Sequence, residues 1–214
     1  MDKSKIVVVL GTPHRQREPG KMSPDKELRE CVYGREIAAD LKPMLEAYGL
    51  TCFIDYEPLD LPKDMQTPDV TRERQRELEL RVSIVNNICR QQRDKECIYV
   101  TIHNDASGSD GKWHEPNGWS ARVGTKASAK SKRLAECLAD AAASNGLRVR
   151  QPTGKQRYWP QKLYVLNNTS CPAVLTENLF MDNVDDKSLL VSDAGRHIIA
   201  RVHLEGILKY IEQL

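Results

Sequence analysis

Short apolar runs and longer amphipathic segments alternate along most of the chain. Strands are predicted at residues 5–10 (KIVVVL), 51–56 (TCFIDY), 97–103 (CIYVTIH), 117–123 (NGWSARV) and 172–180 (PAVLTENLF). A shorter extended piece is predicted at 162–168 (KLYVLNN). The run at 5–10 is apolar on both faces, which is typical of a strand buried in a parallel sheet.

Four other segments have the apolar spacing of amphipathic helices. The first ends at Gly49 and has apolar residues at Ile37, Ala38, Leu41, Met44, Leu45 and Tyr48. Pro43 lies inside it and is expected to kink or shorten it. The others are 71–93, 127–145 and 186 to the C-terminus. The charged sequence TRERQRELELRV (71–82) is interpreted as an exposed helix face.

This alternation of strands and helices predicts an α/β fold with a mainly parallel sheet and helices on both faces. The chain has 214 residues, enough for one domain with a substantial core. We find no linker-like segment. We therefore expect residues 1–214 to form a single domain.

Composition excludes several classes of protein. A net charge of +2 gives little support to nucleic-acid binding, so no nucleic-acid partner is expected. No stretch approaches the roughly 20 apolar residues of a membrane segment. The opening MDKSKIVVVLG has five apolar residues before its glycine. A signal-peptide core needs about 7–15, so we expect no signal peptide. The oligomeric state is not fixed by the sequence.

The six cysteines have no CxxC spacing, which argues against a thiolate zinc site or a redox motif. Most lie in periodic apolar segments. We interpret them as small buried thiols in a reducing compartment. They are Cys31, Cys52, Cys89, Cys97, Cys137 and Cys171.

Polar residues follow the apolar strands at positions where α/β proteins bind ligands. His14 comes just after the first strand, His103 closes the central strand, and Glu177 lies near the end of 172–180. Glu30 begins the first long helix, which brings it back to the same edge of the sheet. Two imidazoles and a carboxylate suit zinc, and a second carboxylate can move a proton. On spacing alone, a strand-end histidine that is only hydrogen-bonded remains an alternative.

The ordered segments VVVLGTPH, SPDKELRECVYGREIAADL, YVTIHNDAS, NGWSARV, PAVLTENLFMDN and IARVHLEGILKY resemble the zinc-dependent N-acetylmuramoyl-L-alanine amidases of the Amidase_3 type, in a phage-lysin-like branch. The resemblance implies a twisted six-stranded sheet and hydrolysis of the amide between N-acetylmuramic acid and L-alanine in peptidoglycan or muropeptides. It implies Zn²⁺ held by His14, Glu30 and His103, with Glu177 as the general base. Asn104, Asp105, Arg157 and Asn167 are the candidate substrate-binding residues.

The resemblance also implies synthesis in the bacterial cytoplasm, with release to the cell wall or periplasm left open. Three positions depart from the family pattern. Pro13 and Arg15 flank His14 where glycines are usual, Asp105 stands where Asn is frequent, and Leu179 replaces a common glycine. None of these removes a proposed ligand.

Two other functions stay open at this stage. One is a zinc carboxypeptidase or peptidase that cuts within the stem peptide. Such enzymes commonly place a glutamate three residues after the first histidine, and here that residue is Arg17. The other is a non-catalytic cell-wall-binding module with a degenerate site. Bound zinc and the identity of the reaction products would distinguish the three functions.

Overall fold

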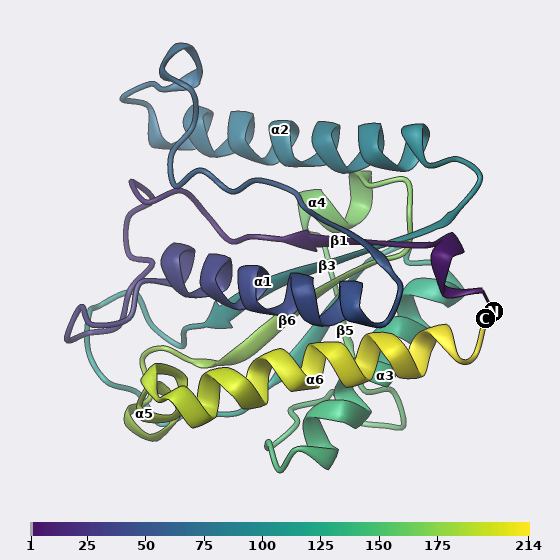
Figure 1. Cartoon of the computed structure of the whole chain (residues 1–214). Coiled ribbons are helices and arrows are strands. Elements are labelled where there is room, and N and C mark those ends of the chain that lie inside the picture. The colour runs from purple at the N-terminus through teal and green to yellow at the C-terminus, as the bar shows by residue number, and fades with distance from the viewer. Residues whose placement is uncertain (1) are drawn as a thin grey trace.

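Six strands form one sheet in residues 2–214, the part of the chain that the computed structural model describes. The strand order is β2 (Thr51–Ile54), β1 (Ile6–Gly11), β3 (Glu96–Asp105), β6 (Ala173–Phe180), β4 (Ser120–Gly124) and β5 (Trp159–Gln161). The first four strands are parallel, β4 is antiparallel to β6, and β5 is parallel to β4. The expected mostly parallel, six-stranded sheet is confirmed (Figure 1).

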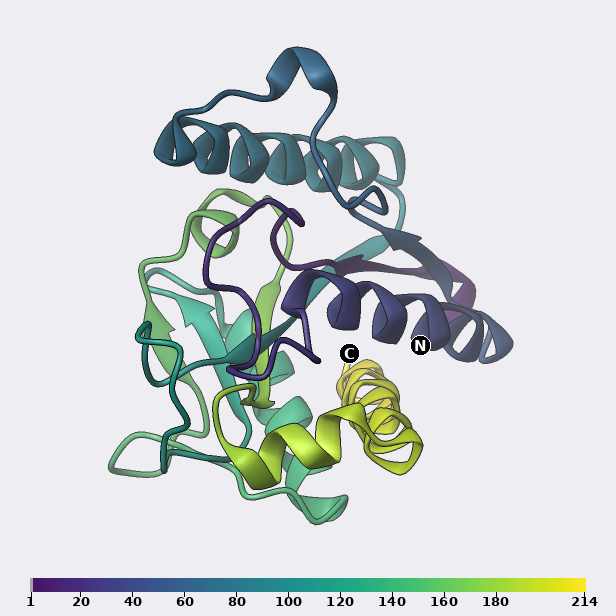
Figure 2. The same cartoon turned by 90° about the vertical axis from the view of Figure 1, so that its left-hand side faces the viewer.

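Helices cover both faces of this sheet (Figures 1 and 2). One face is covered by α1 (Glu30–Ala47), α3 (Ala129–Ser144) and α6 (Asp193–Ile211), and the other by α2 (Val70–Gln91) and α4 (Tyr164–Asn168). The side chains of β1 alternate between the two cores: Val8 packs on the first face, Val7 and Val9 on the second. This two-sided burial explains the continuous apolar run of β1.

The remaining elements are short. They are α5 (Val184–Val191) and the 3₁₀ turns η1 (Lys3–Lys5) and η2 (Lys63–Met65). Within residues 2–214 the structure has no helix of the length and apolar character needed to cross a bilayer.

The prediction of an extended piece at 162–168 is wrong. The strand β5 ends at Gln161, and residues 164–168 form the helix α4. Val165 and Leu166 are both buried although they are adjacent. A strand would point them to opposite faces, whereas a helical turn packs both against the second core.

The C-terminal segment forms two helices instead of one. Ser192 separates α5 from α6 in an extended conformation, and its hydroxyl accepts a hydrogen bond from the Gly195 amide. Serine at an N-cap satisfies an amide that the new helix leaves free. Gly195 is required here, because a Cβ atom would lie 1.8 Å from the carbonyl oxygen of Leu189.

Pro43 does not shorten α1, which continues to Ala47. Proline removes the hydrogen bond to the carbonyl four residues earlier, here that of Ala39. Both residues are exposed, so water can bind this carbonyl.

Candidate metal centre and active site

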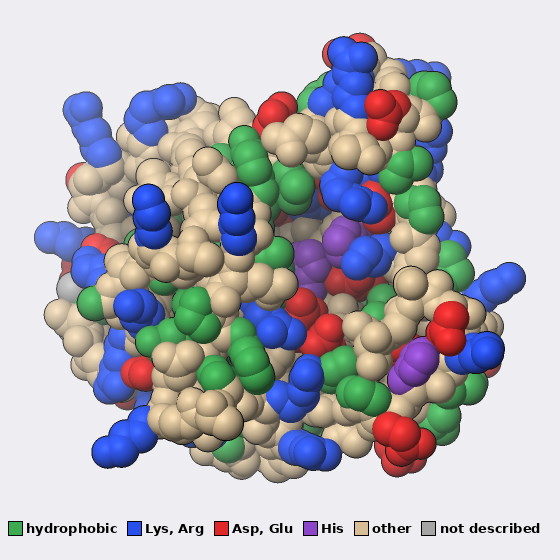
Figure 3. All heavy atoms as spheres, turned by 180° about the vertical axis from the view of Figure 1, so that it is seen from behind, with side chains coloured by type: hydrophobic (Ala, Val, Ile, Leu, Met, Phe, Trp, Pro, Cys, Tyr) green, Lys and Arg blue, Asp and Glu red, His purple; other side chains and the backbone are tan. Residues whose placement is uncertain are grey.

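Three predicted ligands meet at the carboxyl edge of the parallel strands. His14 lies in the loop after β1, Glu30 is the first residue of α1, and His103 is near the end of β3. Their potential ligand atoms all lie within 4.8 Å of one another. Histidine and acidic side chains line a hollow in this surface, with Lys and Arg around it (Figure 3).

Glu30 connects the two histidines. Its Oε1 is 2.9 Å from His103 Nδ1, and its Oε2 is 3.3 Å from His14 Nε2. The carboxylate is 1% exposed, and its Oε2 atom has no hydrogen-bond partner among residues 2–214. A buried oxygen without such a bond, beside two imidazole nitrogens, fits a bound cation.

Burial alone would raise the pKa of Glu30. The charge of His14 and the hydrogen bond from His103 outweigh burial and hold this pKa well below its ordinary value. Burial also lowers the pKa of His103, against the opposing effect of Glu30. An ionised carboxylate and a neutral imidazole are the forms that bind metals.

The loop carrying His14 is tightly constrained by α1. His14 has a φ of 30°, which is uncommon for a residue with a side chain. Arg35 donates a 2.7 Å hydrogen bond to the Pro13 carbonyl. A Cβ atom on Gly34 would lie 2.4 Å from the Pro13 ring, so glycine allows this close approach.

A buried ionic cluster holds the same loop from the side of α2. Arg15 is 2% exposed and pairs with Glu73 at 2.9 Å and Glu77 at 3.0 Å, as well as with Glu18. Arg81 pairs with Glu77 and Asp55 and donates a 3.4 Å hydrogen bond to the His14 carbonyl. The interpretation of 71–82 as an exposed charged face is therefore wrong for every fourth residue from 73 to 81, which is buried. Arg72, Arg74 and Glu79 of the same segment are exposed as expected.

Glu177 lies on β6 directly beside His103 of β3 in the strand register. Burial raises the pKa of Glu177 well above its ordinary value, and the negative charges of Asp105 and Glu30 add to this effect. The positive charge of Arg122 opposes it. A half-buried carboxyl with a raised pKa next to a potential metal centre is suited to carry a proton.

The candidate substrate-binding residues have different surroundings. Asn104 is buried; its amide N–H donates to Glu30 and its side chain donates to the Asn178 carbonyl. Asp105 accepts hydrogen bonds from Arg122 at 3.1 Å and Arg150 at 2.9 Å. Both residues therefore lie at the site, with Asn104 supporting a predicted ligand.

Arg157 and Asn167 are not brought to the metal group. Arg157 pairs with Asp140 of α3. Asn167 accepts a 3.2 Å hydrogen bond from the Thr125 amide, just after β4. Because β4 is antiparallel to β6, this position lies at the opposite edge of the sheet from Glu177.

The sequence reasoning missed Arg122 as a site residue. Arg122 lies on β4 and pairs with Asp105, which is two residues after His103. Alternation along NGWSARV indicates a strand but does not say which face meets the site. A cavity of about 200 Å³ also opens beside both histidines, with Leu78, Leu163 and Tyr164 in its wall.

Comparison with known proteins places these features in a family. The family model for N-acetylmuramoyl-L-alanine amidase matches residues 7–209. The endolysin of Bacillus phage SPP1 is 36% identical over 118 residues, covering 55% of this chain and 41% of that protein. The probable cell wall amidase LytH of Staphylococcus saprophyticus is 25% identical over 213 residues, covering 96% of this chain and 58% of that protein. The chain thus spans about half the length of these relatives.

Solved structures share the fold over nearly the whole chain. The CwlD amidase of Clostridioides difficile, solved in complex with the GerS lipoprotein, has a TM-score of 0.78 at 22% identity and covers 97% of this chain and 99% of its own. The amidase Ami1 of Mycobacterium smegmatis has a TM-score of 0.77 at 16% identity and covers 100% of both chains. With the family match over residues 7–209, the chain belongs to the N-acetylmuramoyl-L-alanine amidase family.

Proposed function

We propose that this chain is a zinc-dependent amidase that hydrolyses the amide between the lactyl group of N-acetylmuramic acid and L-alanine in peptidoglycan. The observation that carries the proposal is the convergence of His14, Glu30 and His103, with Glu177 on the adjacent strand. Membership of the family supports the substrate class. The names of its relatives, an endolysin and a probable cell wall amidase, point to the same polymer.

In this proposal His14, Glu30 and His103 would hold the zinc ion. Their donor set is that of catalytic zinc sites with three protein ligands, and the free Glu30 oxygen is available for coordination. When bound, zinc would act as a Lewis acid and would lower the pKa of the attacking water toward neutrality. The Asn104 amide, which donates to Glu30, keeps the carboxylate oriented.

Glu177 carries the proton in the reaction. The water oxygen bonds to the carbonyl carbon, the C–N bond breaks, and a carboxylate and the free amine of L-alanine result. Glu177 accepts a proton from the water and delivers it to the departing nitrogen. This role requires Glu177 to be ionised before the attack, and a cation held by His14, Glu30 and His103 would favour that form.

The variant Glu177→Gln tests the assignment. It should bind zinc as the wild type does and lose nearly all turnover on purified muropeptides, because an amide cannot accept the proton. Glu212→Gln, at the exposed end of α6, is the matched control and should remain fully active. Turnover of Glu177→Gln at the wild-type rate would contradict the role of Glu177.

Product identity tests the reaction itself. Mass spectrometry should find the intact stem peptide with a new L-alanine amine and a free lactyl carboxylate on the sugar. Cuts within the stem would instead indicate a peptidase. A zinc-loaded protein that hydrolyses neither bond would indicate a binding module.

A further inference from the structure

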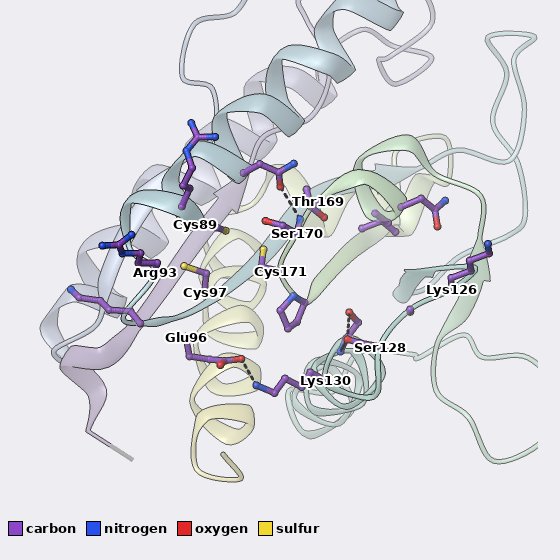
Figure 4. Close-up of a pocket in the computed structure, with 18 residues that line it drawn as sticks. Cys89, Arg93, Glu96, Cys97, Lys126, Ser128, Lys130, Thr169, Ser170 and Cys171 are labelled. Atoms are coloured by element: carbon purple, nitrogen blue, oxygen red, sulfur yellow. Dashed lines mark hydrogen bonds and ion pairs between the residues drawn. The ribbon is translucent and has the colours of Figure 1, made fainter.

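A second pocket lies at the opposite edge of the sheet and is lined by three cysteines (Figure 4). The cavity has a volume of about 660 Å³. Cys97 is near the start of β3 and Cys171 shortly precedes β6, whereas His103 is six residues further along β3. At about 3.3 Å per residue this separates the cysteines from the metal group by roughly 20 Å.

The three thiols come from separate parts of the chain. Cys89 belongs to the last turn of α2, and its side chain lines the pocket together with those of Cys97 and Cys171. Figure 4 shows the three sulfur atoms gathered on one side of the pocket. Cys89 and Cys171 are partly exposed, and all six cysteines of the chain are free thiols.

This arrangement makes Cys89 the thiol that loses its proton most readily. Hydrogen bonds from Cys171 and then Cys97 stabilise the Cys89 thiolate and lower the pKa of Cys89. The same contacts raise the pKa of Cys97 and Cys171, so these two keep their protons.

Basic side chains line much of the pocket. The pocket is lined by Arg90, Arg93, Lys95, Lys126 and Lys130. Glu96 also lines it, and this carboxylate pairs with Lys130 at 2.7 Å. Of these basic residues, Arg90, Arg93 and Lys95 come from the same stretch of chain as Cys89. Positive charge near a cysteine favours the thiolate, which is its nucleophilic form.

We propose that Cys89, Cys97 and Cys171 form a thiol-oxidation site, with Cys89 as the reacting thiolate and one of its two neighbours as the resolving thiol. The inference is independent of the proposed amidase activity. Among residues 2–214, His14, Glu30 and His103 are the group whose ligand atoms all lie within metal-binding range of one another. The three cysteines are not part of that group, and their place on one side of the pocket suits a disulfide better than a three-thiolate metal site.

The oxidant is a peroxide, of which hydrogen peroxide is the simplest. The Cys89 thiolate attacks one peroxide oxygen, and the O–O bond breaks. Cys89 becomes a sulfenic acid, and the second peroxide oxygen leaves as hydroxide. The thiol of Cys171 or Cys97 then attacks the Cys89 sulfur. A disulfide forms and water leaves, so two thiols and one peroxide give one disulfide and two waters. The new bond joins the end of α2 to the amino edge of the sheet.

Alkylation rates test the reactivity of Cys89. Trypsin places the six cysteines on six different peptides, and those of Cys89, Cys97 and Cys171 are residues 82–90, 96–112 and 163–187. The whole reduced protein is treated with limiting iodoacetamide at pH 7. Cys89 should react at least about tenfold faster than the buried thiols, whose pKa values burial raises. These internal controls are Cys31, Cys52 and Cys137.

Oxidation tests the pairing. One equivalent of hydrogen peroxide should join peptide 82–90 to 163–187 or 96–112, and dithiothreitol should reverse the link. Cys89→Ser should abolish it, while the control Cys137→Ser should leave it unchanged. Cys171→Ser should leave a link between Cys89 and Cys97. The proposal is overturned if Cys89 reacts no faster than the buried thiols, if no link forms, or if the link persists in Cys89→Ser.

Discussion

Replacing Arg15 by methionine should destabilise the protein strongly. The Arg15 guanidinium is 2% exposed and contacts the carboxylates of Glu18, Glu73 and Glu77. Methionine fills much of the same space but supplies no charge, so these buried carboxylates lose their shared cation. Breaking a buried ion pair from one side costs about 3–5 kcal/mol of unfolding free energy. For a chain of this size that corresponds to a Tm lower by roughly 6–20 °C.

Arg17→Met is the matched control for this substitution. Arg17 is two residues away, its side chain is 48% exposed, and it lies 3.6 Å from Glu73. An exposed pair of this kind contributes less than about 1 kcal/mol. Urea unfolding of both variants measures the difference directly. Adding Glu73→Gln to Arg15→Met should recover part of the loss, because it removes one carboxylate left without its cation.

Equal stability losses in Arg15→Met and Arg17→Met would refute the reasoning, because burial would then make no difference to the ion pairs. A double variant Arg15→Met/Glu73→Gln that is no more stable than Arg15→Met would refute it as well. Because Arg15 follows His14 directly, zinc affinity provides a second measurement. Arg15→Met should weaken zinc binding, and Arg17→Met should leave it unchanged.

Three other outcomes are expected. Glu30→Gln should weaken zinc binding by more than the roughly 10–100-fold that is typical of losing an outer-shell partner. Glu27 pairs with Lys187, so the control Glu27→Gln should leave zinc binding unchanged. Calorimetric titration with zinc compares the two variants. Burial lowers the pKa of His203 from 6.5 to about 4. As the pH falls, the unfolded chain therefore takes up a proton at His203 before the folded protein does. The free energy of unfolding of the wild type should fall by about 2 kcal/mol between pH 6.5 and pH 5. Urea unfolding of the metal-free proteins at several pH values tests this expectation. A stability of His203→Gln that falls with pH as steeply as that of the wild type would contradict it. Leu179→Gly should cost about 2 kcal/mol, because losing a buried leucine outweighs relief of its φ of 66°, and a higher Tm would show the opposite.

The candidate ligands could be found from the sequence because of how parallel strands end. The carboxyl ends of β1 and β3 share one edge, so residues just after or at the end of each strand converge there. That rule led to His14 and His103 without any knowledge of loop conformation. Glu30 required one further step, the return of α1 to the same edge.

The spacing of the buried charged residues of α2 indicates their burial, although their charge suggests exposure. Glu73, Glu77 and Arg81 are spaced four residues apart, so they share one face of a helix. Val85 continues the same spacing and is fully buried. This face of α2 could therefore have been assigned to the interior. It was not, because charged residues in an amphipathic pattern are normally assigned to the exposed side. The sequence does not reveal that these residues pair with Arg15, because Arg15 lies 58 residues before Glu73.

Asn167 was misplaced for a different reason. Interpreting 162–168 as an extended segment left the direction of the following chain undetermined, and the structure has a helix there. Arg122 escaped notice because its importance depends on the order of strands in the sheet. The antiparallel insertion of β4 beside β6 sets Ser120 opposite Glu177. Neither local propensity nor periodicity predicts which strands become neighbours.

The charges around Glu177 give an electrostatic argument for a divalent cation. Glu30, Glu177 and Asp105 contribute three negative charges when ionised, and Arg122 and Arg150 contribute two positive charges through Asp105. Lys21, 4.0 Å from Glu30, adds a third positive charge, so the charges balance in number. Burial is therefore the main cause that raises the pKa of Glu177, and the negative charges of Asp105 and Glu30 add to it. A divalent ion between the imidazoles would add positive charge beside Glu177 and favour its ionised form. The aspartate at position 105 is thus compatible with metal binding, because the two arginines already balance its charge.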